Sequence, residues 1–231
     1  MLSLFLPEKC VHCGSSSISS SSRSSESNVL SKYLCEACNR ILLAQEAPSL
    51  LEISERLGRI APNLSVNQCA SKFTFYSESP IQSIVHSFKY SAMPALARAC
   101  GRLISDTVPA GMDYLVPVPL HRTRLAERGY NQSEALAEGI ASQLGLRVLR
   151  DIKRNRATPS QTTLSIPQRI NNVRGAFELA ALDSRIKDKN LLIVDDVMTT
   201  GSTLASVAET LLPAKPRSIS ILTLAIAEPS S

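Results

Sequence analysis

The sequence has 231 residues, of which 44% are hydrophobic and 19% are charged, and its formal net charge at pH 7 is +5. This length allows one full domain beside a small module and excludes a large multidomain assembly. The hydrophobic fraction is sufficient for a buried core and excludes a chain that is disordered throughout. The longest mostly apolar run, residues 219–227, is too short to span a bilayer, so we expect no membrane insertion.

The start of the chain and its cysteines indicate the compartment. Residues 1–9 lack the positive charge and the long apolar segment of a secretory signal peptide. Six cysteines are too few for a disulfide scaffold of this length. Four of them form two C-x-x-C pairs, which are Cys10 with Cys13 and Cys35 with Cys38. We therefore expect a cytoplasmic protein with reduced thiols.

The two C-x-x-C pairs predict a structural Zn²⁺ site in a small N-terminal module, residues 1–45. Four thiolates in two tight turns supply the tetrahedral sulfur shell that Zn²⁺ prefers, whereas His12 is a weaker ligand candidate. The inner cysteines, Cys13 and Cys35, are separated by 21 residues, and the serine-rich stretch 15–27 accounts for the unusual length. This stretch has the composition of a flexible linker. A redox role for one pair is the alternative.

Residues 46–75 are predicted as a linker or as a hood over a binding site, with a short helix between Pro48 and Pro62. In residues 76–231 helical and strand-like runs alternate. This alternation predicts an α/β domain with a largely parallel sheet flanked by helices.

Residues 115–132, LVPVPLHRTRLAERGYNQ, predict a strand followed by a phosphate-binding segment. Prolines interrupt the apolar run, so we expect the strand to end near Val116. Arg122, Arg124 and Arg128 follow it, and guanidinium groups bind phosphate oxygens in a bidentate manner. These three arginines are therefore predicted to contact a pyrophosphate group.

The arginines belong to a basic region, residues 120–174. It contains ten Lys or Arg and four Asp or Glu, which gives a local net charge of +6. Such a region attracts phosphates of a small molecule or of a nucleic acid, although a solvated basic face is the alternative. Within it, segment 154–177 is polar and interrupted by prolines. We interpret this segment as a mobile lid or as an ordinary exposed loop.

The clearest predicted helix covers residues 131–145. Asn131 can cap it, Glu134 stands three residues later as in a capping box, and Gly145 supplies the stop. The apolar run 191–194 then predicts a strand that is buried on both faces. A helix over 202–212 and a closing strand over 217–227 follow.

Two carboxylates and a loop of small residues lie between the buried strand and its helix. Asp195 and Asp196 come at the carboxyl end of the strand, where open α/β sheets bind ligands. The backbone N–H groups and hydroxyls of the loop can surround a phosphate at the start of the helix. The loop residues with this predicted role are Thr199, Thr200, Gly201, Ser202 and Thr203. The alternative is an acidic turn before an ordinary helix cap.

Segment 191–203, LLIVDDVMTTGST, resembles the motif with which type I phosphoribosyltransferases bind phosphoribosyl pyrophosphate (PRPP). The resemblance implies that Asp195 and Asp196 hold the ribose hydroxyls, directly or through Mg²⁺ and water. It also implies that residues 199–203 hold the 5′-phosphate. Asp195, Asp196 and Arg128 are then the candidate catalytic residues.

The whole chain resembles the ComF family of competence-associated, phosphoribosyltransferase-like proteins. The resemblance rests on motifs that occur here in the order seen in that family: the cysteine pairs, PVPL followed by RGYNQ, R-x-T-x-x-Q, R-x-x-N-V-R-G-A-F and VDDVMTTGST. The resemblance implies a type I phosphoribosyltransferase-like sheet with a small zinc-ribbon-like module before it. The serine-rich stretch departs from the family pattern.

Two functions follow from the resemblance. The first is an enzyme that transfers phosphoribosyl from PRPP, with Mg²⁺, to an unidentified acceptor. The second is a catalytically vestigial adaptor of the DNA uptake apparatus that binds PRPP or a nucleotide. Competence proteins and single-stranded DNA are the further candidate partners.

Overall fold

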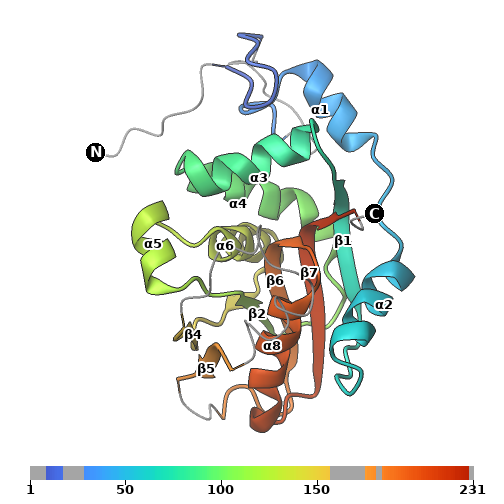
Figure 1. Cartoon of the computed structure of the whole chain (residues 1–231), viewed down its shortest axis with the longest axis vertical. Coiled ribbons are helices and arrows are strands. Elements are labelled where there is room, and N and C mark those ends of the chain that lie inside the picture. The colour runs from blue at the N-terminus through green and yellow to red at the C-terminus, as the bar shows by residue number, and fades with distance from the viewer. Residues whose placement is uncertain (1–8, 18–28, 157–174, 181–183, 229–231) are drawn as a thin grey trace.

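The computed structural model describes residues 9–17, 29–156, 175–180 and 184–228. Its centre is a five-stranded sheet in which every neighbouring pair is parallel (Figure 1). The strands, in spatial order, are β1 (Cys69–Phe75), β7 (Ser218–Ala227), β6 (Asn190–Met198), β2 (Tyr114–Pro117) and β3 (Arg147–Val148). The predicted parallel α/β architecture is confirmed.

Helices cover both faces of this sheet. One face packs against α3 (Pro80–Tyr90), α4 (Pro94–Leu103) and α6 (Gln132–Leu144), and the other against α2 (Leu50–Ile60) and α8 (Ser202–Leu211). Alternate residues of β6 pack against the helices on opposite faces of the sheet, because successive side chains of a strand point to opposite faces. Leu192 and Val194 belong to the first core, and Leu191 and Ile193 to the second.

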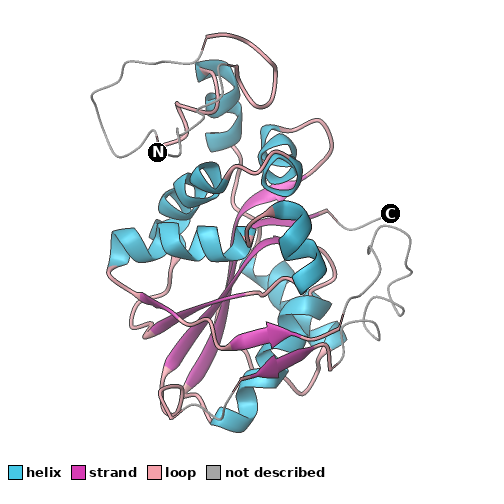
Figure 2. Cartoon of the chain, turned by 90° about the vertical axis from the view of Figure 1, so that its left-hand side faces the viewer, coloured by secondary structure: helices cyan, strands magenta, loops and turns pink. Residues whose placement is uncertain are grey.

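The remaining elements lie outside these layers. Two short antiparallel strands form a sheet of their own, which Figure 2 shows apart from the main one. No helix in the described part of the chain is long and apolar enough to cross a membrane. The remaining elements are α1 (Glu36–Leu43), η2 (Ile104–Thr107), α5 (Arg122–Arg128), β4 (Ile152–Arg154), β5 (Phe177–Leu179) and η4 (Leu212–Ala214).

The cysteine-containing module lies at one end of the molecule, against α3 (Figure 1). Its apolar side chains, among them Leu30, Leu34 and Leu42, are buried in the same core cluster as Ile81 and Ile84 of α3. The described residues of the module therefore share one core cluster with α3.

Three predicted elements differ from the structure in their extent. β6 continues beyond 191–194 to Met198, because its ladder with β7 continues as far as Ile226. Asp195 and Asp196 are thus inside the strand rather than after it. β2 ends at Pro117, one residue later than predicted. β1 is an edge strand of the main sheet although it lies in segment 46–75, which was predicted as linker or hood.

The cap of α6 is as predicted at Asn131, whose Oδ1 accepts the backbone N–H of Ser133 at 3.0 Å. Gly145 closes the helix in the left-handed region with φ 68°. Glu134 has a different partner from the one predicted, because its carboxylate accepts a hydrogen bond from the Arg150 guanidinium. An ion pair takes the place of the expected capping box.

Helices α4 and α6 approach closely at two glycines. A Cβ atom on Gly139 would lie 2.2 Å from the carbonyl oxygen of Arg98, and one on Gly101 would lie 2.1 Å from that of Leu136. Neither contact can be relieved by a side-chain rotation, since both involve backbone atoms. The backbones must therefore separate if either glycine gains a side chain.

We expect Gly139→Ala to lower the free energy of unfolding by about 2 kcal/mol or more, the size typical of overpacked cores. The matched control is Gly58→Ala in the exposed part of α2, where a Cβ atom meets nothing within 4 Å. That change should stabilise the helix by up to about 1 kcal/mol. Urea unfolding of both variants tests the pair, and equal effects would contradict the proposed backbone contact.

Candidate functional site

A pocket of about 490 Å³ opens at the carboxyl ends of the parallel strands. Its walls include Phe75 at the end of β1, Val118 just after β2 and Ala227 at the end of β7. This edge is where parallel α/β sheets bind ligands. The pocket brings together nearly all residues predicted to bind PRPP, which are Arg124, Arg128, Asp195, Asp196, Thr199, Thr200, Gly201, Ser202 and Thr203.

The acidic pair forms the buried floor of this site. Ser133 of α6 donates its hydroxyl to Asp195 Oδ1 at 2.7 Å, and the backbone N–H of Asp196 donates to the same oxygen at 2.9 Å. Lys89 Nζ of α3 lies 3.5 Å from Asp196 Oδ2. Burial, together with the charge of Asp196, raises the pKa of Asp195 to about 7, although Ser133 and Lys89 oppose this shift. A cation or a hydroxyl-bearing ligand would therefore stabilise the ionised pair.

The loop after β6 presents the amino end of α8 to the pocket. Gly201 precedes the helix with φ 87°, a conformation that favours glycine. The hydroxyls of Thr200 and Ser202 lie 2.9 Å apart, and Thr200 Oγ1 also accepts the Ser202 backbone N–H at 3.3 Å. A helix amino terminus with hydroxyls around it is suited to bind a phosphate group.

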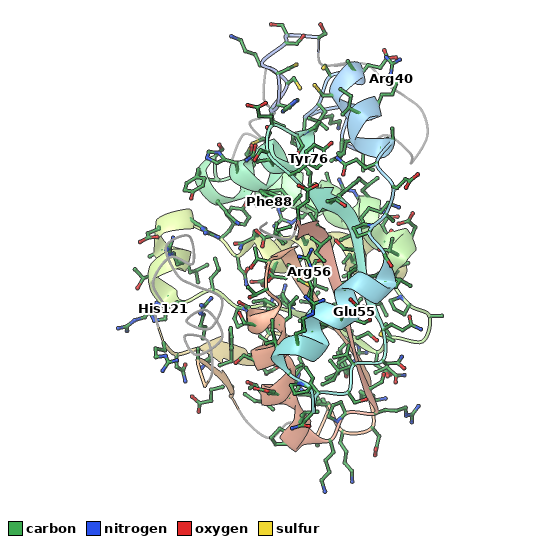
Figure 3. The ribbon with its side chains drawn as sticks, turned by 45° about the vertical axis from the view of Figure 1, so that its right-hand side comes forward. Arg40, Glu55, Arg56, Tyr76, Phe88 and His121 are labelled. Atoms are coloured by element: carbon green, nitrogen blue, oxygen red, sulfur yellow. The ribbon has the colours of Figure 1, made fainter. Side chains whose placement is uncertain are left out.

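Helix α2 supports this loop from outside. Arg56 Nη1 donates to the carbonyl oxygen of Thr199 at 3.2 Å and to that of Ala227 at 2.5 Å. Figure 3 shows Arg56 pointing from α2 toward the strand ends. A Cβ atom on Gly201 would lie 3.1 Å from Leu57 Cδ2, so α2 also restricts the size of the side chain at position 201. Sequence reasoning missed Arg56, because one arginine in a short helix gives no signal of a contact so distant along the chain.

A basic wall faces the acidic pair. It contains Arg124 and Arg128 of α5, His121 before α5 and Arg154 at the end of β4. Arg122, the third predicted arginine, is exposed at the first position of α5 and is absent from the pocket lining. Two of the three predicted arginines are therefore in place for an anionic group.

Arg154 was predicted only as the start of segment 154–177. Its guanidinium carbon lies 5.3 Å from the centre of the Phe177 ring. Burial lowers the pKa of Arg154, although attraction to Asp195 opposes this change. Residues 157–174, the greater part of the predicted lid, lie outside the described residues. The structure adds Arg154 to the wall, where its charge faces Asp195.

Helix α3 contributes two further residues that sequence reasoning did not assign, Lys89 and Tyr90. Tyr90 is 70% exposed at the pocket, and its ring centre lies 4.4 Å from that of His86. Tyr130, in the loop between α5 and α6, donates its hydroxyl to the Phe88 carbonyl oxygen at 2.8 Å. This contact joins the loop to the last turn of α3.

The second candidate site is the cysteine cluster, in which the four predicted thiols lie within 4.8 Å of one another. Cys13 Sγ and Cys35 Sγ are 3.7 Å apart, and a tetrahedron with Zn–S bonds of ~2.3 Å has sulfur–sulfur edges of about 3.8 Å. His12 Nδ1 is directed to Ser83 Oγ of α3, 3.0 Å away. The four sulfurs could therefore hold a metal ion, while His12 joins the module to α3.

The thiols differ in acidity. Burial opposes ionisation of Cys10, but backbone N–H groups of Cys13, Cys35 and His12 outweigh it and lower the pKa of Cys10 to about 7. Burial and the neighbouring thiols raise the pKa of Cys38. Four such groups would not all ionise without a cation between them, which is consistent with a metal site.

Comparison with known proteins concerns the phosphoribosyltransferase-like part of the chain. Residues 130–231 match the family model of the phosphoribosyl transferase domain. DNA utilization protein YhgH of Escherichia coli O6:H1 is 34% identical over 142 residues, which cover 58% of this chain and 61% of that protein. The aligned region thus spans about three fifths of the YhgH relatives. Competence protein F of Haemophilus influenzae is 31% identical over 57% of this chain and 62% of its own length.

Competence protein ComFC of Bacillus subtilis is more distant but aligns over more of the chain, with 26% identity over 72% of this chain and 67% of that protein. Among solved structures, the glutamine PRPP amidotransferase of B. subtilis has a TM-score of 0.39 and 18% identity, with 58% of this chain and 26% of that chain covered. The matched domain and the competence-protein relatives agree with the order of motifs and support a ComF-family protein with a phosphoribosyltransferase-like domain.

Proposed function

We propose that this protein binds PRPP with Mg²⁺ in the pocket and transfers the phosphoribosyl group to an acceptor. The observation that carries the proposal is the convergence of three groups on one pocket: the acidic pair, the amino end of α8 and the basic wall. PRPP needs a partner for its ribose hydroxyls, one for its 5′-phosphate and one for its pyrophosphate. The three groups have the matching chemistry.

In this proposal each wall of the pocket acts on one part of the reaction. As the bond from ribose C1 to pyrophosphate breaks, positive charge develops on the ring and negative charge on the leaving group. Asp195 and Asp196 hold the ribose and favour the cationic ring, while Arg124 and Arg128 stabilise the departing pyrophosphate. Carboxylate oxygens suit Mg²⁺, which would supply further positive charge to the phosphate oxygens. The acceptor then bonds to C1.

The proposal also covers the domains of the protein and its partners. We assign residues 1–45 to a module with one Zn²⁺ on the four cysteines and residues 76–231, together with β1 of segment 46–75, to the phosphoribosyltransferase-like domain. The rest of segment 46–75 is assigned to a linker or hood, and the protein is proposed to be cytoplasmic. The names of the relatives, which refer to competence and DNA utilization, support a role in DNA uptake. They are equally consistent with the second candidate function, an adaptor that binds PRPP or a nucleotide without turnover. Competence proteins and single-stranded DNA are its candidate partners.

A screen of nucleobases and amines with labelled PRPP tests the two functions. We expect at least one acceptor to release pyrophosphate, and the release should disappear in the Asp195→Asn, Asp196→Asn double variant. Tight PRPP binding with no release from any acceptor would support the adaptor. Absence of PRPP binding, measured by calorimetry in Mg²⁺, would contradict the enzyme, and absence of both PRPP and nucleotide binding would contradict both functions.

A further inference from the structure

Lys89 is a protein cation placed at the acidic pair. It occupies the last turn of α3, and its side chain is 29% exposed beside an Asp196 side chain that is 7% exposed. Asp196 Oδ1 accepts the backbone N–H of Val197 at 2.8 Å. Asp196 Oδ2 is buried without a hydrogen-bond partner among the described residues, and Lys89 Nζ lies 3.5 Å from it.

At this distance Lys89 offsets the charge of Asp196 but does not form a hydrogen bond of normal length with it. A charge-assisted hydrogen bond between an ammonium and a carboxylate is ~2.7–2.9 Å long. At 3.5 Å, Lys89 compensates the charge of Asp196 but leaves the capacity of Oδ2 to accept a hydrogen bond unused. A ligand hydroxyl can therefore bind Oδ2 without displacing the cation.

The position of Lys89 is fixed by two contacts of its helix. The Tyr130 hydroxyl donates to the carbonyl oxygen of Phe88, the residue before Lys89, at 2.8 Å. Earlier in α3, the cysteine module meets the helix through His12 and Ser83. In Figure 1, α3 lies between this module and the carboxyl ends of β6 and β7. Lys89 is thus held at the pocket before any ligand arrives.

We propose that Lys89 is a further binding residue of the pocket, the resident counter-ion that allows the acidic pair to accept ribose hydroxyls next to an anionic ligand. This inference rests on the proposed function. Two uncompensated carboxylates would repel the phosphates of PRPP, and a cation between carboxylate and ligand removes this repulsion. Bound Mg²⁺ supplies positive charge to the same region. The contribution of Lys89 should therefore be largest when the metal is absent.

The test is calorimetric titration of PRPP into wild type, Lys89→Met and Lys89→Arg, each in EDTA and in Mg²⁺. In EDTA we expect Lys89→Met to raise the Kd for PRPP about 10-fold or more, whereas in Mg²⁺ the loss should shrink to about 3-fold. Lys89→Arg keeps the charge and should stay within about 3-fold of wild type in both buffers. A merely structural lysine would not make the loss depend on the metal.

The matched control is Lys72→Met, since Lys72 of β1 pairs with Asp106 at 2.7 Å outside the pocket lining. It should leave PRPP binding unchanged in both buffers, and thermal melts confirm that each variant is folded. The role of Lys89 would be overturned if Lys89→Met bound PRPP in EDTA as tightly as wild type does, or if it lost the same affinity with and without Mg²⁺. Either result would leave the proposed function intact. No binding by wild type in either buffer would overturn both.

Discussion

Replacing Cys10 and Cys35 by serine is expected to remove the bound metal and to release the N-terminal module from α3. Both thiols are buried in a cluster whose four sulfurs lie within 4.8 Å, and serine is a poor Zn²⁺ ligand. Structural zinc contributes folding free energy directly, about 10 kcal/mol or more in small zinc modules. Elemental analysis should find about one equivalent of zinc in wild type and almost none in the variant.

The consequence for the module follows from its shared core. Leu30, Leu34 and Leu42 are buried in one core cluster with side chains of α3, and we expect this burial to depend on the cysteines. Hydrogen exchange over residues 29–43 should therefore become much faster in the variant, while exchange in β6 should stay slow. Cys69→Ala, which removes a buried thiol outside the cluster, is the control and should keep the metal. Wild-type protein with less than about half an equivalent of zinc, after zinc-replete expression, would contradict the assignment.

The elements that the sequence predicted well are those with local signals. Helix α6 has a cap at Asn131 and a glycine stop at Gly145, and both contacts are present. The strand at 191–194 was recognised from continuous apolar residues, which are buried against both helical layers. The loop 199–203 was predicted from its small residues, and all of it lines the pocket.

The helical period explains why Arg122 is absent from the pocket lining. Arg124 and Arg128 are four residues apart in α5 and share a face of the helix, which is the face that lines the pocket. Arg122 stands two residues before Arg124 and lies on a different face. Because the sequence pattern predicts no helix over these residues, the three arginines cannot be separated by helical face from the sequence alone.

Lys89, Arg56 and Arg154 could not be predicted by the same reasoning. Lys89 meets Asp196 from α3, and Arg56 meets the Thr199 carbonyl from α2. Each contact joins residues far apart in the chain, and it depends on how helices pack on the sheet rather than on a local pattern. Basic residues in helices usually lie in solvent, so a single lysine or arginine gives no sign of such a role.

The Asp195→Asn, Asp196→Asn double variant is expected to lose PRPP binding and to keep its stability. Removing charged hydrogen-bond acceptors for two ribose hydroxyls should raise the Kd for PRPP about 100-fold or more in Mg²⁺. The amide introduced by Asp195→Asn keeps a carbonyl oxygen, so the Ser133 hydroxyl still has an acceptor. Calorimetric titration measures the loss. Asp113→Asn, at the other end of the strands, where Asp113 accepts the Asn190 N–H, is the control and should bind PRPP normally.

The pH dependence of stability separates a binding role of the pair from a structural one. Burial raises the pKa of Asp195 from 3.8 to about 7 in the folded protein. A group with a raised folded pKa contributes stability that is fully present below the unfolded pKa and is lost as pH rises through the folded one. The ligand-free wild type should therefore lose this contribution between about pH 4 and about pH 7, whereas the double variant has no such group to ionise.

Thermal melts of the ligand-free proteins at about pH 5 and about pH 8.5 should show this difference. The double variant should equal or exceed wild type in melting temperature at the higher pH, and the gap should narrow at the lower pH. The Asp113→Asn control should show no such pH trend, because the backbone N–H of Asn190 and the Lys189 ammonium lower the pKa of Asp113, so that its contribution to stability is present at both pH values. If the double variant binds PRPP as wild type does, Asp195 and Asp196 do not hold the ribose, and if it melts far below wild type at the higher pH, the pair has a structural role instead.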